Sequence, residues 1–150
     1  GDIDAVQLLT EPYEDAGGSS ISYTPPAGTT QVIYEFTFQS GRVDNTQYTH
    51  WRFYIDSDEV TDARTSICGQ YIETRSYLRW GINIGGSAVT ATGRQASWSS
   101  AKTLQVKMRR YGNTTYGKLH AVRMWEGDGY EWGDTDEPFM RPCIGITAIG

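Results

Sequence analysis

Alternation of hydrophobic and polar residues is the clearest pattern along this chain. In residues 31–38 (QVIYEFTF) the large apolar side chains occupy every second position, so they fall on one side of an extended chain. A period of two is that of a β-strand with one buried face. Residues 102–111 alternate in the same way, and no stretch carries a convincing helical period. The pattern predicts an all-β protein.

Further alternating segments, separated by turns rich in Gly, Pro, Ser and Asn, bring the expected total to eight or nine strands. Their spacing is that of an antiparallel β-sandwich of jelly-roll-like form. Gly69 and Gly81, inside expected strands, are candidate β-bulges. The expected strands cover residues 4–10, 21–23, 31–39, 48–56, 65–72, 75–84, 102–111, 116–126 and 142–149.

The length of 150 residues fits one β-sandwich domain, residues 1–150, with a single core. A chain that begins with Gly rather than Met fits a processing site, a tag scar or a cut from a longer chain, and we expect a fragment or C-terminal piece of a longer protein. No apolar run approaches the roughly 20 residues that span a bilayer, so we expect no membrane insertion.

The charge balance bears on the choice of partner. The formal net charge is -5, which argues against duplex nucleic acid, because phosphate binding needs clustered Lys and Arg. The densest basic cluster is KMRR at residues 107–110, in which Lys107 and Arg109 share one strand face. Two such residues are a weak patch, so the simplest interpretation is a solvated face.

Two cysteines, Cys68 and Cys143, lie 75 positions apart without any spacing typical of zinc. They could form one disulfide if the fold brings them together. The alternative is a pair of buried free thiols, since cysteine packs as a small apolar residue. The sequence leaves both open.

Several blocks together resemble a module common in marine bacteriophage genomes. They are YTPPAGTTQVIYEFTFQ, HWRFYIDSDEVTDAR, WGINIGG, ATGRQASWSSAKTLQVKMRRYG, GKLHAVRMW and the final ITAIG. The match covers roughly residues 21–150. The module resembles the C-terminal part of virion structural proteins of the tail-fibre type.

The resemblance implies a surface-exposed, trimeric phage protein that binds a host-cell surface glycan or protein, or decorates the particle. It implies contacts with other virion proteins, a place on the virion surface after assembly in the bacterial cytoplasm, no cofactor and no catalytic residues. Residues 41–47 and 126–139 are the loops expected to vary with the target.

The loop at residues 127–137 (GDGYEWGDTDE) is the best candidate ligand site, because flat aromatic faces can stack on sugars and carboxylates can bind sugar hydroxyls or calcium. A solvated loop with its aromatic residues folded on the core is the alternative. Trp98 also lies near a loop and is a candidate for exposed contact. The candidate ligand-binding residues are Asp128, Tyr130, Glu131, Trp132, Asp134, Asp136 and Trp98.

A second acidic segment, residues 57–62 with the preceding aspartate, is expected to form a turn. Its carboxylates could ligate calcium, although acids in turns commonly bond backbone amides instead. The candidate metal ligands are Asp56, Asp58, Glu59 and Asp62. The two histidines, His50 and His120, lie on expected strands without a nucleophile motif such as GxSxG, so both are expected to be structural.

These observations favour a non-enzymatic virion module at a tail-fibre tip. The alternatives are a capsid decoration protein, a carbohydrate-binding module, and a glycan hydrolase, which would need two carboxylates facing each other in a cleft.

Overall fold

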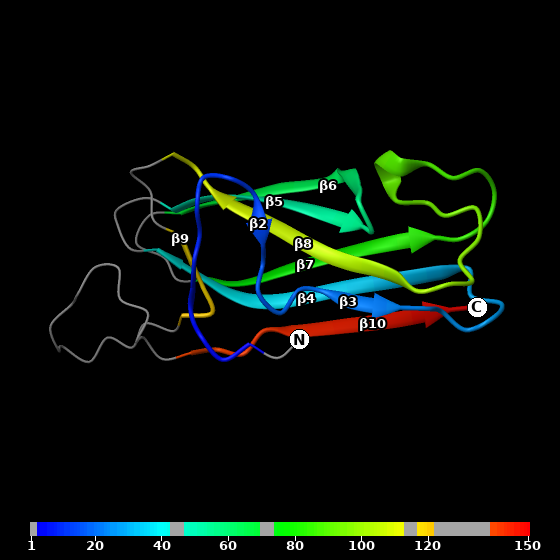
Figure 1. Ribbon diagram of the computed structural model, residues 1–150, viewed down its shortest axis with the longest axis horizontal. Coiled ribbons are helices and arrows are strands. Elements are labelled where there is room, and N and C mark those ends of the chain that lie inside the picture. Colours follow the sequence, from blue (N-terminus) through cyan, green and yellow to red (C-terminus); the bar gives the residue numbers. More distant parts are fainter. Residues whose placement is uncertain (1–2, 43–46, 70–73, 113–116, 122–138) are drawn as a thin grey trace, which may run out of the picture.

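The computed structural model describes residues 3–42, 47–69, 74–112, 117–121 and 139–150. In these ranges the chain forms two antiparallel sheets whose strands run along the length of the molecule (Figure 1). The prediction of an all-β antiparallel sandwich is confirmed. No helix in the described ranges is long and apolar enough to cross a membrane. The elements are β1 (Gln7–Leu8), β2 (Glu14–Asp15), β3 (Ile21–Tyr23), β4 (Gln31–Arg42), β5 (Gln47–Ile55), β6 (Asp58–Gly69), β7 (Thr74–Asn83), the 3-10 helix η1 (Thr90–Thr92), β8 (Lys102–Arg110), β9 (Gly117–Leu119) and β10 (Cys143–Ile149).

Strand pairing is nested in the manner of a jelly roll. β5 pairs with β6, β4 with β7, β2 and β3 with β8, and β1 with β9. The first sheet, sheet A, therefore has the order β1-β9-β4-β7, with β10 beside the first part of β4. The second, sheet B, has the order β2-β8-β5-β6, with β3 also on β8. A jelly roll is the double-sheet arrangement in which such nested pairs fold over one another.

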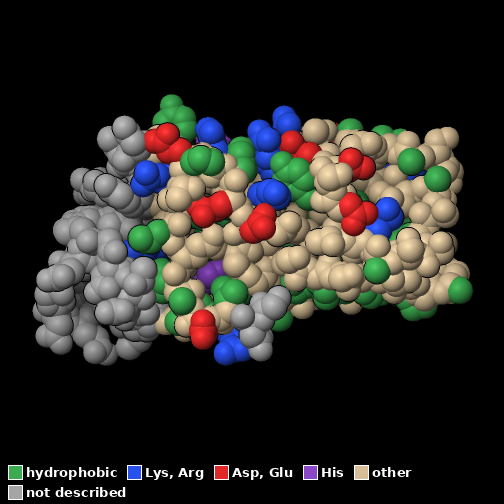
Figure 2. All heavy atoms as spheres, in the orientation of Figure 1, with side chains coloured by type: hydrophobic (Ala, Val, Ile, Leu, Met, Phe, Trp, Pro, Cys, Tyr) green, Lys and Arg blue, Asp and Glu red, His purple; other side chains and the backbone are tan. Residues whose placement is uncertain are grey.

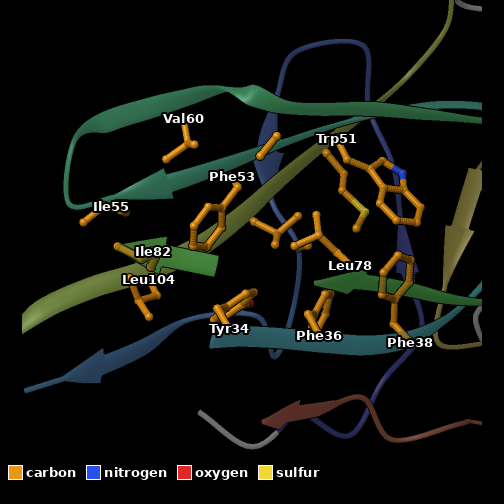
Figure 3. Packing of buried hydrophobic residues seen from close by; sticks show 14 of the residues in the cluster. Tyr34, Phe36, Phe38, Trp51, Phe53, Ile55, Val60, Leu78, Ile82 and Leu104 are labelled. Atoms are coloured by element: carbon orange, nitrogen blue, oxygen red, sulfur yellow. The ribbon is translucent and has the colours of Figure 1, made fainter. Parts of the chain in front are cut away.

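Aromatic side chains from β4 and β5 form the centre of the core between the sheets (Figure 3). The rings of Phe38 and Trp51 lie 4.6 Å apart between centroids, and those of Tyr34 and Phe53 lie 4.9 Å apart. Every second residue of β4 from Val32 to Ser40 is buried, as its alternation predicts. Apolar burial of this kind is the main favourable term in folding.

Tyr34 is buried yet carries a polar group that must be satisfied. Its hydroxyl donates a hydrogen bond of 2.6 Å to the carbonyl oxygen of Ser19. Burial raises the pKa of Tyr34, so the hydroxyl stays protonated and remains a donor. The Ser19 hydroxyl in turn donates to the carbonyl of Val106, which ties the N-terminal segment to β8.

One β-bulge interrupts the pairing of β5 with β6. Trp51 faces Thr65 and Phe53 faces Val60, so residues 61–64 lie opposite Arg52 alone. The bulge reverses which face of the sheet the odd- and even-numbered residues of β6 point to. Glu59 and Arg64, an odd number of positions apart, therefore lie on the same face as Arg52, and Glu59 pairs with both arginines. The predicted bulges are wrong, because Gly69 and Gly81 are paired in unbroken register with Gln47 and Ile33.

Candidate functional site

Six of the seven predicted ligand residues lie outside the described residues, so the loop at 127–137 stays a prediction. They are Asp128, Tyr130, Glu131, Trp132, Asp134 and Asp136. The described structure places its candidate chemistry elsewhere.

The prediction that Trp98 is available for exposed contact is wrong. Only 7% of Trp98 is exposed, and its ring packs edge-on against Tyr23 at 6.2 Å between centroids. The segment between β7 and β8 folds onto the end of the core, where a Cβ on Gly93 would lie 3.1 Å from both Ile55 and Val60. A loop that closes the sandwich in this way buries its large apolar residue, which sequence position alone does not reveal.

The expected acidic turn is shorter than predicted, because β6 begins at Asp58 and the turn is limited to Asp56 and Ser57. Asp56 bonds the backbone: one carboxylate oxygen accepts from the Thr103 amide at 2.8 Å and the other from the Lys102 ammonium at 3.3 Å. This is the turn-capping alternative to metal binding.

Glu59, another candidate metal ligand, is held between two arginines. It accepts from the Arg64 guanidinium and lies 3.3 Å from Arg52. The hydrogen bonds from Arg64, with the positive charge of Arg52, lower the pKa of Glu59 and keep it anionic. The remaining candidates, Asp58 and Asp62, are exposed, and no cluster of three metal-ligating side chains occurs in the described ranges.

The cysteines lie in different sheets. Cys143 opens β10 opposite Thr37 in sheet A, whereas Cys68 lies in β6 opposite Tyr48 in sheet B. Cys143 is a free and exposed thiol. The structure thus has no disulfide at Cys143, and the expectation that this thiol is buried is wrong.

A cluster of basic and aromatic side chains covers the outer side of sheet B. The register places His50 opposite Arg109 and Arg52 opposite Lys107, so the outward residues of β5 and β8 form one surface. Figure 2 shows Lys and Arg side chains gathered among acidic and hydrophobic ones over the region where β2, β5 and β8 lie in Figure 1. We call this surface the basic–aromatic face; its members are Tyr13, Tyr48, His50, Arg52, Tyr54, Arg64, Lys107, Arg109 and Tyr111, with the carboxylates Asp15 and Glu59.

Tyr13 orders the two central guanidinium groups of this face. The Arg52 guanidinium carbon lies 4.0 Å from the centroid of the Tyr13 ring, and that of Arg109 lies 5.4 Å from it. Both distances are within the range of a cation–π interaction. A guanidinium stacked on a ring keeps its N–H edge directed away from the ring, where it can bind an anion.

The charges of the basic–aromatic face are incompletely neutralised. Glu59 serves Arg52 and Arg64 together, and Asp15 lies 3.4 Å from Lys107. Arg109 has no carboxylate partner within the described part of the chain. An excess of cationic groups is therefore concentrated here on a protein whose net charge is -5.

The pKa of His50 is affected by the charges of the basic–aromatic face. Partial burial, with the positive charges of Arg109 and Arg52, lowers the pKa of His50 from its ordinary value of 6.5. His50 is therefore mainly neutral at pH 7, and an anion bound near the two arginines would raise its pKa.

Two tyrosines extend the face at one end. Tyr48 and Tyr111 contact each other with ring centroids 5.7 Å apart, and His50 contacts the Tyr111 ring edge-on at 6.1 Å. Tyr111 is 57% exposed and Tyr48 is 39% exposed, so ring surface reaches solvent beside the arginines. Exposed aromatic surface next to hydrogen-bonding groups is typical of binding sites.

The other histidine, His120, is fully buried beside β9. It follows the strand with a φ of 68°, in the left-handed region that only a few non-glycine residues adopt. Burial lowers the pKa of His120 to about 4, and neither ring nitrogen has a hydrogen-bond partner among the described residues. His120 is neutral at pH 7, which agrees with a structural role rather than with contact to a ligand.

A groove of about 310 Å³ lies at the edge of the sandwich between β3 and β10. Its lining combines apolar side chains with Ser20 and Arg141, and it lacks the group of aromatic and cationic side chains of the basic–aromatic face. The lining residues are Ile3, Gly18, Ser20, Ile21, Arg141, Pro142 and Ile144.

Comparison with known proteins adds no relative, since no family model and no curated protein matches this chain.

The sequence identifies several members of the basic–aromatic face but does not show that they lie side by side. Lys107 and Arg109 share a strand face by their spacing, and His50, Arg52 and Tyr54 alternate with the core residues of β5. Only the pairing of β5 with β8, more than fifty residues later, joins the two sets. A signal was available in the sequence, because Lys107 and Arg109 alternate on β8 and Arg52 lies among the outward aromatic residues of β5.

Proposed function

We propose that this protein is a non-enzymatic surface module of a bacteriophage particle, placed at the tip of a tail fibre, that recognises a glycan or protein on the host cell. The observation that carries the proposal is the basic–aromatic face, where aromatic rings and cations lie together on the outer side of one sheet. Interfaces are enriched in Tyr and Arg, and these residues often carry a large share of the binding energy.

The jelly-roll topology supports the proposal only as an analogy. This architecture is used by viral capsid proteins and lectins, but a fold hosts many functions and the site must decide. The resemblance to marine phage tail-fibre modules points in the same direction as the chemistry of the face.

A homotrimer suits this function, because three weak sites that act together bind a cell surface far more tightly than one. Ile33 and Tyr54 occupy outward strand positions on opposite sheets. We propose that the subunit contact lies away from the basic–aromatic face, which stays free for the host.

Binding to cells tests the proposal. Fluorescently labelled protein is incubated with a panel of marine bacterial isolates, and the bound fraction is measured by flow cytometry for the wild type, Tyr111→Ala and Trp132→Ala. Tyr111→Ala removes exposed ring surface from the basic–aromatic face, whereas Trp132→Ala changes the loop at 127–137. We expect saturable binding that Tyr111→Ala weakens.

The outcomes separate the alternatives. Loss of binding through Trp132→Ala alone would move the recognition site to the loop. Binding to purified phage heads without any cell binding would overturn the proposal in favour of a capsid decoration protein. A monomer that binds free polysaccharide equally well would favour a carbohydrate-binding module, and light scattering at micromolar concentration measures that mass.

A further inference from the structure

We propose that Arg52 and Arg109, held on the ring of Tyr13, form a subsite for the carboxylate or sulfate groups of an acidic polysaccharide. This inference rests on the proposed function and names the chemical class of the ligand. It concerns the basic–aromatic face alone and needs neither the loop at 127–137 nor a metal ion.

The geometry of the guanidinium groups is the first argument. Arginine offers N–H donors in a planar fork that matches the two oxygens of a carboxylate or sulfate. Tyr13 contacts both guanidiniums, at 4.0 Å for Arg52 and 5.4 Å for Arg109, so their orientation is fixed before a ligand arrives. Such preorganisation reduces the entropy lost on binding.

The unequal pairing of the two arginines is the second argument. Arg52 already shares Glu59 with Arg64, whereas Arg109 has no carboxylate partner in the described structure. The side-chain Nε atoms of Arg52 and Arg109 are both buried without a hydrogen-bond partner in the described structure, so the carboxylate pairing alone distinguishes the two arginines. The site thus holds cationic hydrogen-bonding capacity that the protein itself does not use, and an anion would use it.

The arrangement of the aromatic residues favours a chain of sugars over an isolated anion. Tyr48, His50, Arg52 and Tyr54 are the outward residues of β5, spaced about 7 Å apart because alternate strand residues are two steps of about 3.4 Å apart. This row is about 20 Å long, with a tyrosine ring at each end and Arg52 between them. A short oligosaccharide with spaced acidic groups fits such a row.

The carboxylates on the face favour a polysaccharide over a nucleic acid. A nucleic acid presents a phosphate at every nucleotide, and close to this surface it would meet Glu59 and Asp15 as well as a protein of net charge -5. A polysaccharide with fewer charges can place each acidic group on the arginine pair and avoid both carboxylates.

Three dextrans with the same backbone give a direct test. Unmodified dextran, carboxymethyl dextran and dextran sulfate are immobilised, and binding of the full chain is measured at pH 7 and 0.15 M salt. We expect binding to one or both acidic dextrans and not to dextran, and the stronger of the two identifies carboxylate or sulfate as the preferred group.

Matched variants localise the effect. Arg109→Gln removes one cation from the subsite, and we expect about a tenfold higher Kd, the usual effect of losing one charge-assisted hydrogen bond. Arg79→Gln makes the same charge change on the outer side of sheet A, where Arg79 is more than half exposed, and should leave Kd unchanged. Arg109→Lys keeps the charge without the fork and should give an intermediate Kd; it also serves if Arg109→Gln fails to fold.

Four results would overturn the inference. Equal weakening by Arg109→Gln and Arg79→Gln would mean nonspecific attraction, and equal binding to all three dextrans would mean that no acidic group is recognised. Tighter binding of single-stranded poly(dT) than of either acidic dextran would assign the face to nucleic acid. Cell binding without binding to any acidic dextran would reject the inference and leave the proposed function standing, whereas absence of both would reject both.

Discussion

The outer faces of the two sheets come from the same strand alternation and yet differ in chemistry. On sheet B, Arg52 and Arg109 share one tyrosine ring and exceed the carboxylates that contact them. On sheet A, Glu35 is balanced within the face: it accepts from the Tyr77 hydroxyl at 2.6 Å and lies 3.4 Å from the Arg79 guanidinium. The outer face of sheet B therefore has more cations than carboxylates, whereas the central charges on the outer face of sheet A are paired.

Small residues reinforce the difference. Gly145 lies opposite Glu35 and Gly81 opposite Ile33, so the centre of the outer face of sheet A carries no side chain at these two positions. A Cβ on Gly145 would lie 3.2 Å from a Glu35 carboxylate oxygen. The comparison teaches that alternation assigns a residue to an outer face, whereas the partners across the register decide whether that face is suited to an anion.

The largest effect is expected from the core that supports both faces. Phe53→Ala should lower the free energy of unfolding by about 3–5 kcal/mol, the usual cost of removing a buried ring, and weaken binding through loss of the folded state. Urea denaturation followed by fluorescence measures it. Ser57→Ala, in the exposed turn before β6, is the control and should stay within about 0.5 kcal/mol.

Acid should reveal the buried His120. Because burial lowers the pKa of His120 from 6.5 to about 4, the unfolded chain takes up a proton at this residue before the folded chain does. Proton uptake by His120 in the unfolded chain therefore lowers the free energy of unfolding as the pH falls from 6.5 toward 4, by up to about 3 kcal/mol. Above pH 6.5 His120 is neutral in both states and this loss is absent.

Urea denaturation at several pH values between 7.5 and 4 checks this prediction. His120→Asn is the matched variant, because asparagine does not titrate and tolerates the left-handed backbone at this position. Its stability should fall less steeply with decreasing pH than that of the wild type. Parallel curves for the two proteins would contradict the assignment.

Tyr13 on the outer side of sheet B and Tyr77 on that of sheet A offer a matched pair of substitutions. Tyr13→Leu removes the ring under Arg52 and Arg109 and should raise the Kd for the preferred acidic dextran about three- to tenfold, the range expected for one or two cation–π contacts. Tyr77→Leu makes the same change on sheet A and should leave Kd unchanged. Similar effects from both variants would remove the distinction between the faces.

The pH dependence of anion binding should show a smaller difference between the two faces. The charged groups facing His50 are Arg109 on β8 and Arg52 on its own strand, with the neutral Ser66 opposite on β6 and the Tyr111 ring beside it. An anion on the arginines offsets their charge and raises the pKa of His50, so binding should tighten as the pH falls below 6.5. Calorimetric titration of His50→Gln should show a weaker pH dependence.

The smallest effect is expected for the paired charges of sheet A. Glu35→Gln disrupts an ion pair with a largely exposed Arg79, and such pairs contribute about 0–1 kcal/mol. The hydrogen bond to Glu35, which raises the pKa of Tyr77, is weakened in the same variant. Thermal denaturation should detect at most a small loss, and a large loss would show that this face is held together more strongly than its exposure suggests.

The sequence predicted the sheet class and most of the strands, because a period of two needs only local information. It did not predict β2 and placed the start of β6 at residue 65 instead of Asp58. It did not predict the register of β5 with β8, which depends on the whole fold, and so the basic–aromatic face was seen only as two separate strands. The bulge opposite Arg52 was missed for the same reason, since no glycine marks it. Trp98 was misjudged because a loop residue becomes a core residue when its loop closes the end of the sandwich.

The most direct test of the distinction between the two faces is an NMR titration of the isotope-labelled protein with a short dextran sulfate oligosaccharide, and with its unsulfated counterpart as control. We predict that only the sulfated ligand shifts amide signals, and that the shifts concentrate on residues 48–54 and 105–109 of β5 and β8. Shifts concentrated instead on β7 and the centre of β4, or in the loop at 127–137, would contradict the assignment of binding to the outer face of sheet B.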